Sequence, residues 1–271
     1  MNFLQFDFET HNKDEQEKLI ALLAELEFDG FIEEGLTLQA FTSENSFNQN
    51  EFEKILEKFS ILAYSKTTIK NINWNQKWEE DFEPVLIDKF AGIRAHFHKP
   101  LKSVKHEIII TPKMSFGTGH HATTSMMIHL MKDINFKGKT VLDFGTGTGI
   151  LAILAEKMGA TSVTAIDNDD WSIENAKENI EQNNCKLIKV IKSDRINQPA
   201  KYDVILANIN LNVILDNLET IALTGGNSVK ILLSGFLKAD EIAVNKFAVS
   251  QGLRKRNLLK EKEWIAIFYE K

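Results

Sequence analysis

The sequence has few of the features that form disulfides, span membranes or coat nucleic acid. Its 271 residues include one cysteine, Cys185, so an internal disulfide is excluded. No stretch approaches the roughly 18 consecutive apolar residues of a membrane span, and the first residues lack the pattern of a signal peptide. The formal net charge of −6 disfavours nonspecific binding to nucleic acid. We therefore expect a cytoplasmic monomer that contacts neither membrane nor nucleic acid directly.

The N-terminal part predicts a small α+β domain. Apolar residues alternate with polar ones in the first strand and recur at helical spacing in two later segments. The order strand, helix, strand, strand, helix, strand matches a ferredoxin-like fold. These elements are expected at residues 3–8, 14–27, 30–34, 36–41, 50–59 and 63–72. Because no catalytic group of residues occurs here, we interpret residues 1–72 as a substrate-recognition domain.

Residues 73–84 are predicted to be a charged linker that carries two tryptophans. Trp74 and Trp78 are four residues apart and would share one face of a helix. They are interpreted either as packing anchors or as part of an interdomain hinge that helps to present substrate.

The remaining residues, 85–271, predict an α/β domain. From Thr140 onward apolar strands alternate with helices, which indicates a parallel sheet with helices on both faces. The last two strands have no helix between them, so an antiparallel hairpin is expected to close a seven-stranded sheet. The strands are expected at residues 140–144, 162–166, 187–191, 202–207, 229–233, 253–259 and 264–269.

A glycine-rich turn from Val141 to Leu151 carries the strongest functional signal. Glycines let the backbone approach a ligand closely, and the following helix adds exposed N–H groups. The third glycine comes one residue too early for a dinucleotide fingerprint, and Asp143 precedes the loop. The D-x-G-x-G-x-G pattern resembles the first motif of class I methyltransferases, which bind S-adenosylmethionine. We expect Gly145 and Gly147 to contact this cofactor, although a turn that binds nothing is the alternative.

Two further strands end in polar residues that suit an adenosine-containing ligand. Asp167 lies about twenty residues beyond the glycine loop, where a carboxylate can accept hydrogen bonds from both ribose hydroxyls. Asn208 follows a later strand and would lie at the carboxyl edge of the sheet, where ligands of open α/β sheets bind. Asn208 is alternatively a helix cap, although Asn210 is the better candidate for that role.

A loop rich in glycine and threonine precedes the predicted parallel sheet. Residues 117–119 form a flexible turn that can fold over bound cofactor, and a helix is expected to begin within residues 123–125. His120 and His121 are adjacent, so they cannot both face one metal ion from a regular element. We expect no metal site.

Several blocks together resemble the PrmA family, whose members methylate ribosomal protein eleven of the large subunit. The resemblance covers nearly the whole chain and rests on residues 116–124, 141–151 and 207–209, with support from 73–78, 82–84, 234–237 and 264–266. It implies that the N-terminal domain grips the ribosomal protein and that the linker lets this domain swing. It also implies cofactor contacts at Thr124, Gly145, Asp167 and Asn208.

The chain departs from the family pattern around the loop. Thr111 and Lys113 replace an acidic residue and a glycine beside the proline, and Ala122 replaces a proline. These changes affect loop stiffness and substrate fit, and they leave the expected cofactor contacts intact.

The predicted reaction is methylation of amino groups, on lysine side chains, on an α-amine, or on both. No catalytic residue is expected, because the cofactor is already activated and the protein mainly positions the reactants. One alternative is a methyltransferase for ribosomal RNA or a small molecule. The negative charge and the absence of an Asn-Pro-Pro run after Ala207 disfavour it. The other alternative is a non-enzymatic scaffold that binds S-adenosylmethionine.

Overall fold

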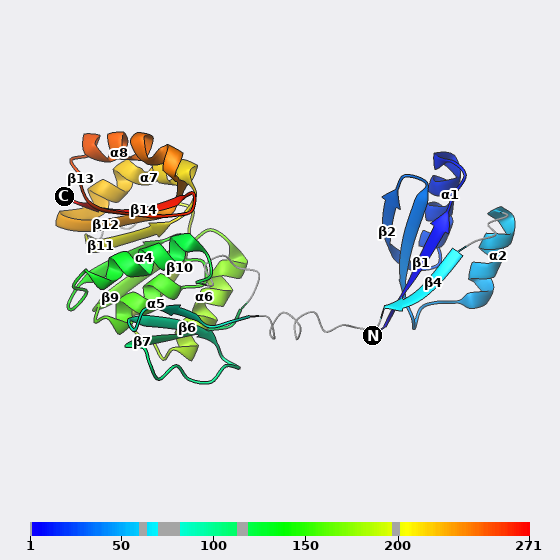
Figure 1. Ribbon diagram of the computed structural model, residues 1–271, viewed down its shortest axis with the longest axis horizontal. Helices are drawn as coiled ribbons and strands as arrows, with labels where there is room; N and C mark the ends of the chain where they lie inside the picture. The colour runs from blue at the N-terminus through cyan, green and yellow to red at the C-terminus, as the bar shows by residue number, and fades with distance from the viewer. Residues whose placement is uncertain (1, 60–63, 70–81, 113–118, 197–200) are drawn as a thin grey trace. The chain divides into compact units, whose positions relative to one another are not determined.

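Figure 1 shows the computed structural model of the chain. The structure describes residues 2–59, 64–69, 82–112, 119–196 and 201–271. The chain divides into two compact units, Met1–Asp81 and Phe82–Lys271. The two predicted linker tryptophans, Trp74 and Trp78, lie outside the described residues, as does Lys113. None of the described helices has the length and hydropathy needed to cross a membrane.

The first unit has the predicted ferredoxin-like order. Its elements are β1 (Phe3–Glu9), α1 (Lys13–Ala24), β2 (Phe28–Glu34), β3 (Thr37–Ser43), α2 (Gln49–Phe59) and β4 (Tyr64–Ile69). The strands form an antiparallel sheet in the order β2-β3-β1-β4. The alternation in β1 buries Leu4, Phe6 and Phe8 in a core shared with the two helices. This packing explains why the short amphipathic helices are stable here.

The second unit is built on the predicted seven-stranded sheet. Its strands are β8 (Thr140–Phe144), β9 (Ser162–Asp167), β10 (Ile188–Lys192), β11 (Tyr202–Asn208), β12 (Gly225–Leu237), β13 (Arg254–Glu261) and β14 (Trp264–Glu270). Their order is β10-β9-β8-β11-β12-β14-β13. The first five strands in this order, from β10 to β12, are parallel to one another. The strands β14 and β13 form the expected antiparallel hairpin. The class I methyltransferase fold predicted from the sequence is therefore confirmed.

Helices cover both faces of this sheet, as Figure 1 shows. They are α4 (Ala122–Lys132), α5 (Ile150–Lys157), α6 (Asp170–Gln182), α7 (Leu211–Thr224) and α8 (Glu241–Ser250), the last preceded by the short 3-10 turn η1 (Lys238–Asp240). One apolar core lies beneath α4 and α5, and a second lies beneath α7 and α8. Asn210 caps α7 by accepting a hydrogen bond from the Val213 N–H, so the cap is Asn210 and not Asn208.

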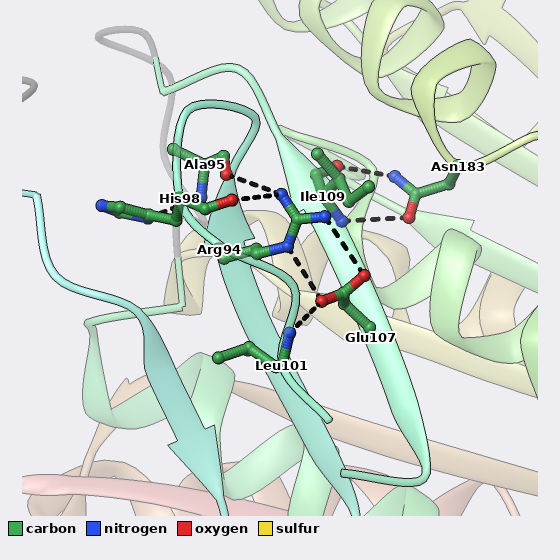
Figure 2. Close-up of polar contacts among 7 residues, drawn as sticks. All are labelled: Arg94, Ala95, His98, Leu101, Glu107, Ile109 and Asn183. Carbon is green, nitrogen blue, oxygen red and sulfur yellow. Dashed lines mark hydrogen bonds and ion pairs between the residues drawn. The ribbon is translucent and has the colours of Figure 1, made fainter. Parts of the chain in front are cut away.

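A three-stranded sheet in the second unit was not predicted. It consists of β5 (Val85–Ile87), β6 (Ala91–Ala95) and β7 (His106–Ile110). Figure 2 shows a partly buried ion pair between β6 and β7, in which Arg94 Nε and Nη2 donate to the two oxygens of Glu107 at 2.8 and 3.2 Å. Hydrogen bonding to Arg94 holds the pKa of Glu107 below its ordinary value.

The small sheet is fixed to the main domain through α6. The Asn183 amide accepts from the Ile109 N–H at 3.0 Å and donates to the Ile109 carbonyl at 2.6 Å (Figure 2). One helical turn earlier, Asn179 accepts from the Thr111 N–H and donates to the Thr148 carbonyl, both at 2.8 Å. Asn183, at the C-cap of α6, therefore holds β7, and Asn179 joins the residue after β7 to the glycine-rich loop.

Candidate active site

The carboxyl edge of the main sheet borders one cavity of about 670 Å³. Its volume suits a small-molecule ligand. All five residues predicted to bind the cofactor line it: Thr124, Gly145, Gly147, Asp167 and Asn208. They come from the start of α4 and from the ends of β8, β9 and β11. The sheet order brings them together because β8 lies between β9 and β11. Their contact with a cofactor stays a prediction.

Gly145 and Gly147 of the glycine-rich loop have positive φ, a conformation that other residues rarely adopt. Gly145 has φ of +76°, and a Cβ there would collide with the side chain of Ile209. Gly147 has φ of +53°, and its N–H donates to Asp167 Oδ2 at 2.8 Å. This hydrogen bond ties the glycine-rich loop to the end of β9. The two segments that are predicted to contact the cofactor therefore form one connected edge of the cavity.

Replacement of Gly147 by valine should strongly weaken cofactor binding and preserve the fold. A branched side chain would enter the space where backbone faces the ligand, and it would adopt an unfavourable positive φ. We expect the affinity for S-adenosylmethionine, measured by calorimetry, to fall roughly ten-fold or more. The matched control is Gly252→Val, which carries the same backbone strain at φ +78° with open space around its Cβ. Equal affinity in both variants would identify the loop as a structural turn.

Asp167 keeps acceptor capacity for a ligand. Its Oδ2 accepts from the Gly147 N–H, and its Oδ1 accepts from the Asp169 N–H at 3.1 Å. A carboxylate has about four lone-pair sites, so each oxygen can accept one further hydrogen bond. The two backbone donors fix the orientation of the carboxylate at the cavity wall. This arrangement fits a pair of adjacent hydroxyl groups, as on a ribose.

Asn208 and Thr124 form a buried polar pair at the cavity. Asn208 Nδ2 donates to Thr124 Oγ1 at 3.3 Å, and both side chains are buried. The Oδ1 atom of Asn208 is also buried and has no hydrogen-bond partner among the described residues. A buried amide oxygen without a partner costs free energy, and a ligand N–H would satisfy it.

Asp143 lies beneath the glycine-rich loop and is almost completely buried. Its Oδ2 accepts from Thr146 Oγ1 at 2.6 Å and from the Ala152 N–H at 3.2 Å. Removal from water dominates over these bonds and raises the pKa of Asp143 to about 7. The carboxyl group therefore holds the loop and the start of α5 together, and its charge depends on pH near neutrality.

The free energy of unfolding should depend on pH through the ionisation of Asp143. Between its ordinary pKa of 3.8 and its folded value of about 7, folded Asp143 holds a proton that the unfolded chain has released. The free energy of unfolding should therefore fall as pH rises through this window, and the contribution should be constant above it. Denaturant titrations across this range should give a shallower fall for Asp143→Asn than for the wild type. Parallel curves would show that Asp143 ionises normally.

Other cavity residues were not predicted. Ser193 and Asp194 follow β10, and no motif in the sequence marked them. His121 and Trp264 stand at another part of the wall, with ring centroids 4.7 Å apart and planes at 72°. Across the described residues, no three His, Cys, Asp or Glu side chains gather closely enough to hold a metal ion.

The parallel sheet with its terminal hairpin, the glycine-rich loop and the carboxylate at the end of β9 define the fold of a class I methyltransferase. The model of the family described as "Ribosomal protein L11 methyltransferase (PrmA)" matches residues 7–271. The chain belongs to this family.

Individual relatives agree with this assignment. The chain is 38% identical over 281 residues to a protein of Porphyromonas gingivalis named ribosomal protein L11 methyltransferase, which covers 98% of this chain and 97% of the relative. A protein of the same name from Chlorobaculum tepidum is 35% identical, with 99% and 96% covered. The crystal structure of a ribosomal protein L11 methylase from Lactobacillus delbrueckii matches with a TM-score of 0.65 at 26% identity, covering 69% of this chain and 98% of that one. The resemblance noted from the sequence motifs is thus confirmed.

Proposed function

We propose that this protein transfers methyl groups from S-adenosylmethionine to amino groups of ribosomal protein L11, on lysine side chains, on the α-amine, or on both. One observation carries the proposal: the carboxylate of Asp167, which has acceptor capacity left, and the buried amide oxygen of Asn208, which has no partner among the described residues, belong to the same cavity. The names of the relatives supply the protein substrate. Because ribosomal proteins are cytoplasmic, the proposal assigns the enzyme to the cytoplasm.

The residues on the cavity wall suit the parts of this cofactor. Asp167 would accept the ribose hydroxyls, and the backbone of Gly145 and Gly147 would face the rest of the ligand across the loop. Thr124 would fix the amide of Asn208 next to the reacting methyl group. When bound there, S-adenosylmethionine would supply an electrophilic methyl group, which a neutral amine can accept while the sulfur leaves as a neutral thioether.

The protein's contribution is to orient and neutralise the amine. A lysine with pKa near 10.4 must lose a proton at a cost of roughly 4–5 kcal/mol at neutral pH, whereas an α-amine costs about 1 kcal/mol. A water-poor cavity next to a positive sulfonium lowers the amine pKa further. Asn208 Oδ1 would accept an N–H of the amine and direct its lone pair toward the methyl group. The protein then needs no dedicated general base.

We assign substrate recognition to the first unit. Its described residues form a folded core of their own. Its β1 presents a fixed carboxylate, Asp7, that accepts hydrogen bonds from Gln5, Gln39 and Ser65. These bonds lower the pKa of Asp7, so it is charged at neutral pH and suits a basic protein partner.

A labelling experiment tests the proposed substrate. Purified protein is incubated with radiolabelled S-adenosylmethionine and, in separate reactions, with a total extract of ribosomal proteins and with ribosomal RNA, both from a strain that lacks this enzyme. We expect label in one band, identified as L11. Label in ribosomal RNA, or in no macromolecule, would contradict the proposal.

A further inference from the structure

We propose that Asn179, on α6, is a positioning residue for cofactor binding. Its side chain holds the glycine-rich loop in place relative to the small sheet, and the loop in turn borders the cavity. Asn179 is fully buried and does not line the cavity itself, so it acts through the loop and does not touch the ligand. The inference rests on the proposed function, because it concerns the cofactor of that reaction.

The two asparagines on α6 match the spacing of the residues that they hold. Asn179 and Asn183 are four residues apart, which separates them by about 6 Å along the helix axis. Their partners, Thr111 and Ile109, are two residues apart, which corresponds to about 6.6 Å along an extended chain. Because the two spacings agree, α6 can bind both residues at once.

The two side-chain amides differ in where they donate. Asn183 uses its amide on Ile109 alone in β7, accepting from the N–H at 3.0 Å and donating to the carbonyl at 2.6 Å (Figure 2). Asn179 accepts from the Thr111 N–H at 2.8 Å, but its Nδ2 donates to the Thr148 carbonyl, also at 2.8 Å. Thr148 belongs to the glycine-rich loop and lines the cavity. Of the two amides, the one at Asn179 therefore connects the small sheet to the cavity wall.

The glycine-rich loop lies directly against α6 at this point. Gly149 has φ of +81°, and a Cβ there would lie 3.4 Å from Cα and Cβ of Ala176. One helical turn before Asn179, Asn175 Oδ1 accepts the other hydrogen of the Asn179 Nδ2 group at 2.7 Å. This bond fixes the amide of Asn179 in the orientation that donates to Thr148.

The small sheet is a firm anchor for this contact. Arg94 joins β6 to β7 through Glu107, and its Nη1 donates to the carbonyls of Ala95 and His98 at 3.1 and 3.0 Å (Figure 2). A loop that is already ordered loses less conformational entropy when a ligand binds. Asn179 should therefore raise the affinity for S-adenosylmethionine without changing the methyl-transfer step.

The test compares Asn179→Asp with Asn183→Asp. Both substitutions place a carboxyl group at a buried position of α6 and keep an acceptor for a backbone N–H, but only Asn179→Asp removes the donor to Thr148. Asn179→Ala and Asn183→Ala form a second, uncharged pair, which replaces the first if a buried carboxyl group prevents folding.

Three measurements are made on each variant. Calorimetry gives the affinity for S-adenosylmethionine, and methylation of purified L11 gives kcat and the KM for each substrate. Hydrogen exchange on the protein without cofactor reports the order of the glycine-rich loop and of β7 separately, so this readout does not depend on activity.

We expect Asn179→Asp to bind S-adenosylmethionine roughly five- to thirty-fold more weakly, and the KM for this cofactor to rise by a similar factor. The kcat and the KM for L11 should stay within about two-fold of the wild type. Hydrogen exchange should accelerate in residues 145–152. Asn183→Asp should keep its cofactor affinity within about two-fold and accelerate exchange in residues 106–110 instead. The alanine pair should show the same contrast.

The outcomes separate this inference from the proposed function. Equal losses of affinity in the two members of a pair would overturn the positioning role, because they would reflect a general loosening of α6. Unchanged affinity in a folded Asn179 variant would overturn it as well. A wild type that binds S-adenosylmethionine and does not methylate L11 would contradict the proposed function, and the calorimetric comparison would still decide the role of Asn179.

Discussion

Replacement of Asp167 with alanine should reduce the affinity for S-adenosylmethionine by roughly ten- to a hundred-fold. Two ribose hydroxyls would lose a charged acceptor, and hydrogen bonds to charged groups contribute about 1.5–3 kcal/mol. The variant also loses the acceptor for the Gly147 N–H, so the glycine-rich loop becomes less ordered at the point where the ligand lies. Calorimetry at fixed pH and salt measures the change.

The control for this variant is Asp170→Ala. Asp170 is three residues further along the chain, and its exposed side chain pairs with Lys192 at 2.6 Å on the protein surface. A surface ion pair contributes at most about 1 kcal/mol to stability, and Asp170 does not line the cavity. Asp170→Ala should therefore bind cofactor as the wild type does. Normal affinity in a folded Asp167→Ala protein would refute the assignment of the ribose site.

Removal of the first unit should separate cofactor binding from substrate recognition. A chain that begins at residue 73 retains both apolar cores of the second unit and the whole cavity wall. It should fold and bind S-adenosylmethionine with an affinity within about two-fold of the full chain. Its kcat/KM on L11 should fall by roughly ten-fold or more, because remote binding contacts orient the reacting amine.

Two readouts make the truncation decisive. Calorimetry reports whether the cavity is intact, and mass spectrometry at limiting L11 reports the rate of methylation. Equal rates of L11 methylation for the truncated and full-length proteins would show that the first unit does not recognise the substrate. A folded truncated chain without cofactor affinity would show that the boundary between the units is misplaced.

The main sheet and its binding edge could be predicted because their signals are local. Buried parallel strands are continuous apolar runs, and their carboxyl ends meet at one edge. Asp167 and Asn208 each end such a run, so their meeting at one cavity follows once the strand order is known. The sequence signal for the helix cap at Asn210 is also local, because the cap depends on one side chain and the first turn of α7.

The small sheet and the far end of the cavity depend on distant contacts. The strands β5 to β7 are three to five residues long, and β6 contains a buried arginine whose partner is on β7. A short run interrupted by a charge does not read as a strand. Trp264 reaches the cavity because β14 returns antiparallel beside β12, and Asp143 has a raised pKa because neighbouring elements exclude water. Neither effect has a signature in the residues nearby in the sequence.

The most direct test of the proposed function is the mass of purified L11 after incubation with this protein and S-adenosylmethionine. The account predicts that L11 gains whole numbers of methyl groups, that fragmentation locates them on amine nitrogens, and that Asp167→Ala at low cofactor concentration reduces the gain. The opposite result is an L11 of unchanged mass in the presence of a folded protein that binds cofactor. That outcome would contradict the assignment of this chain as a methyltransferase of ribosomal protein L11.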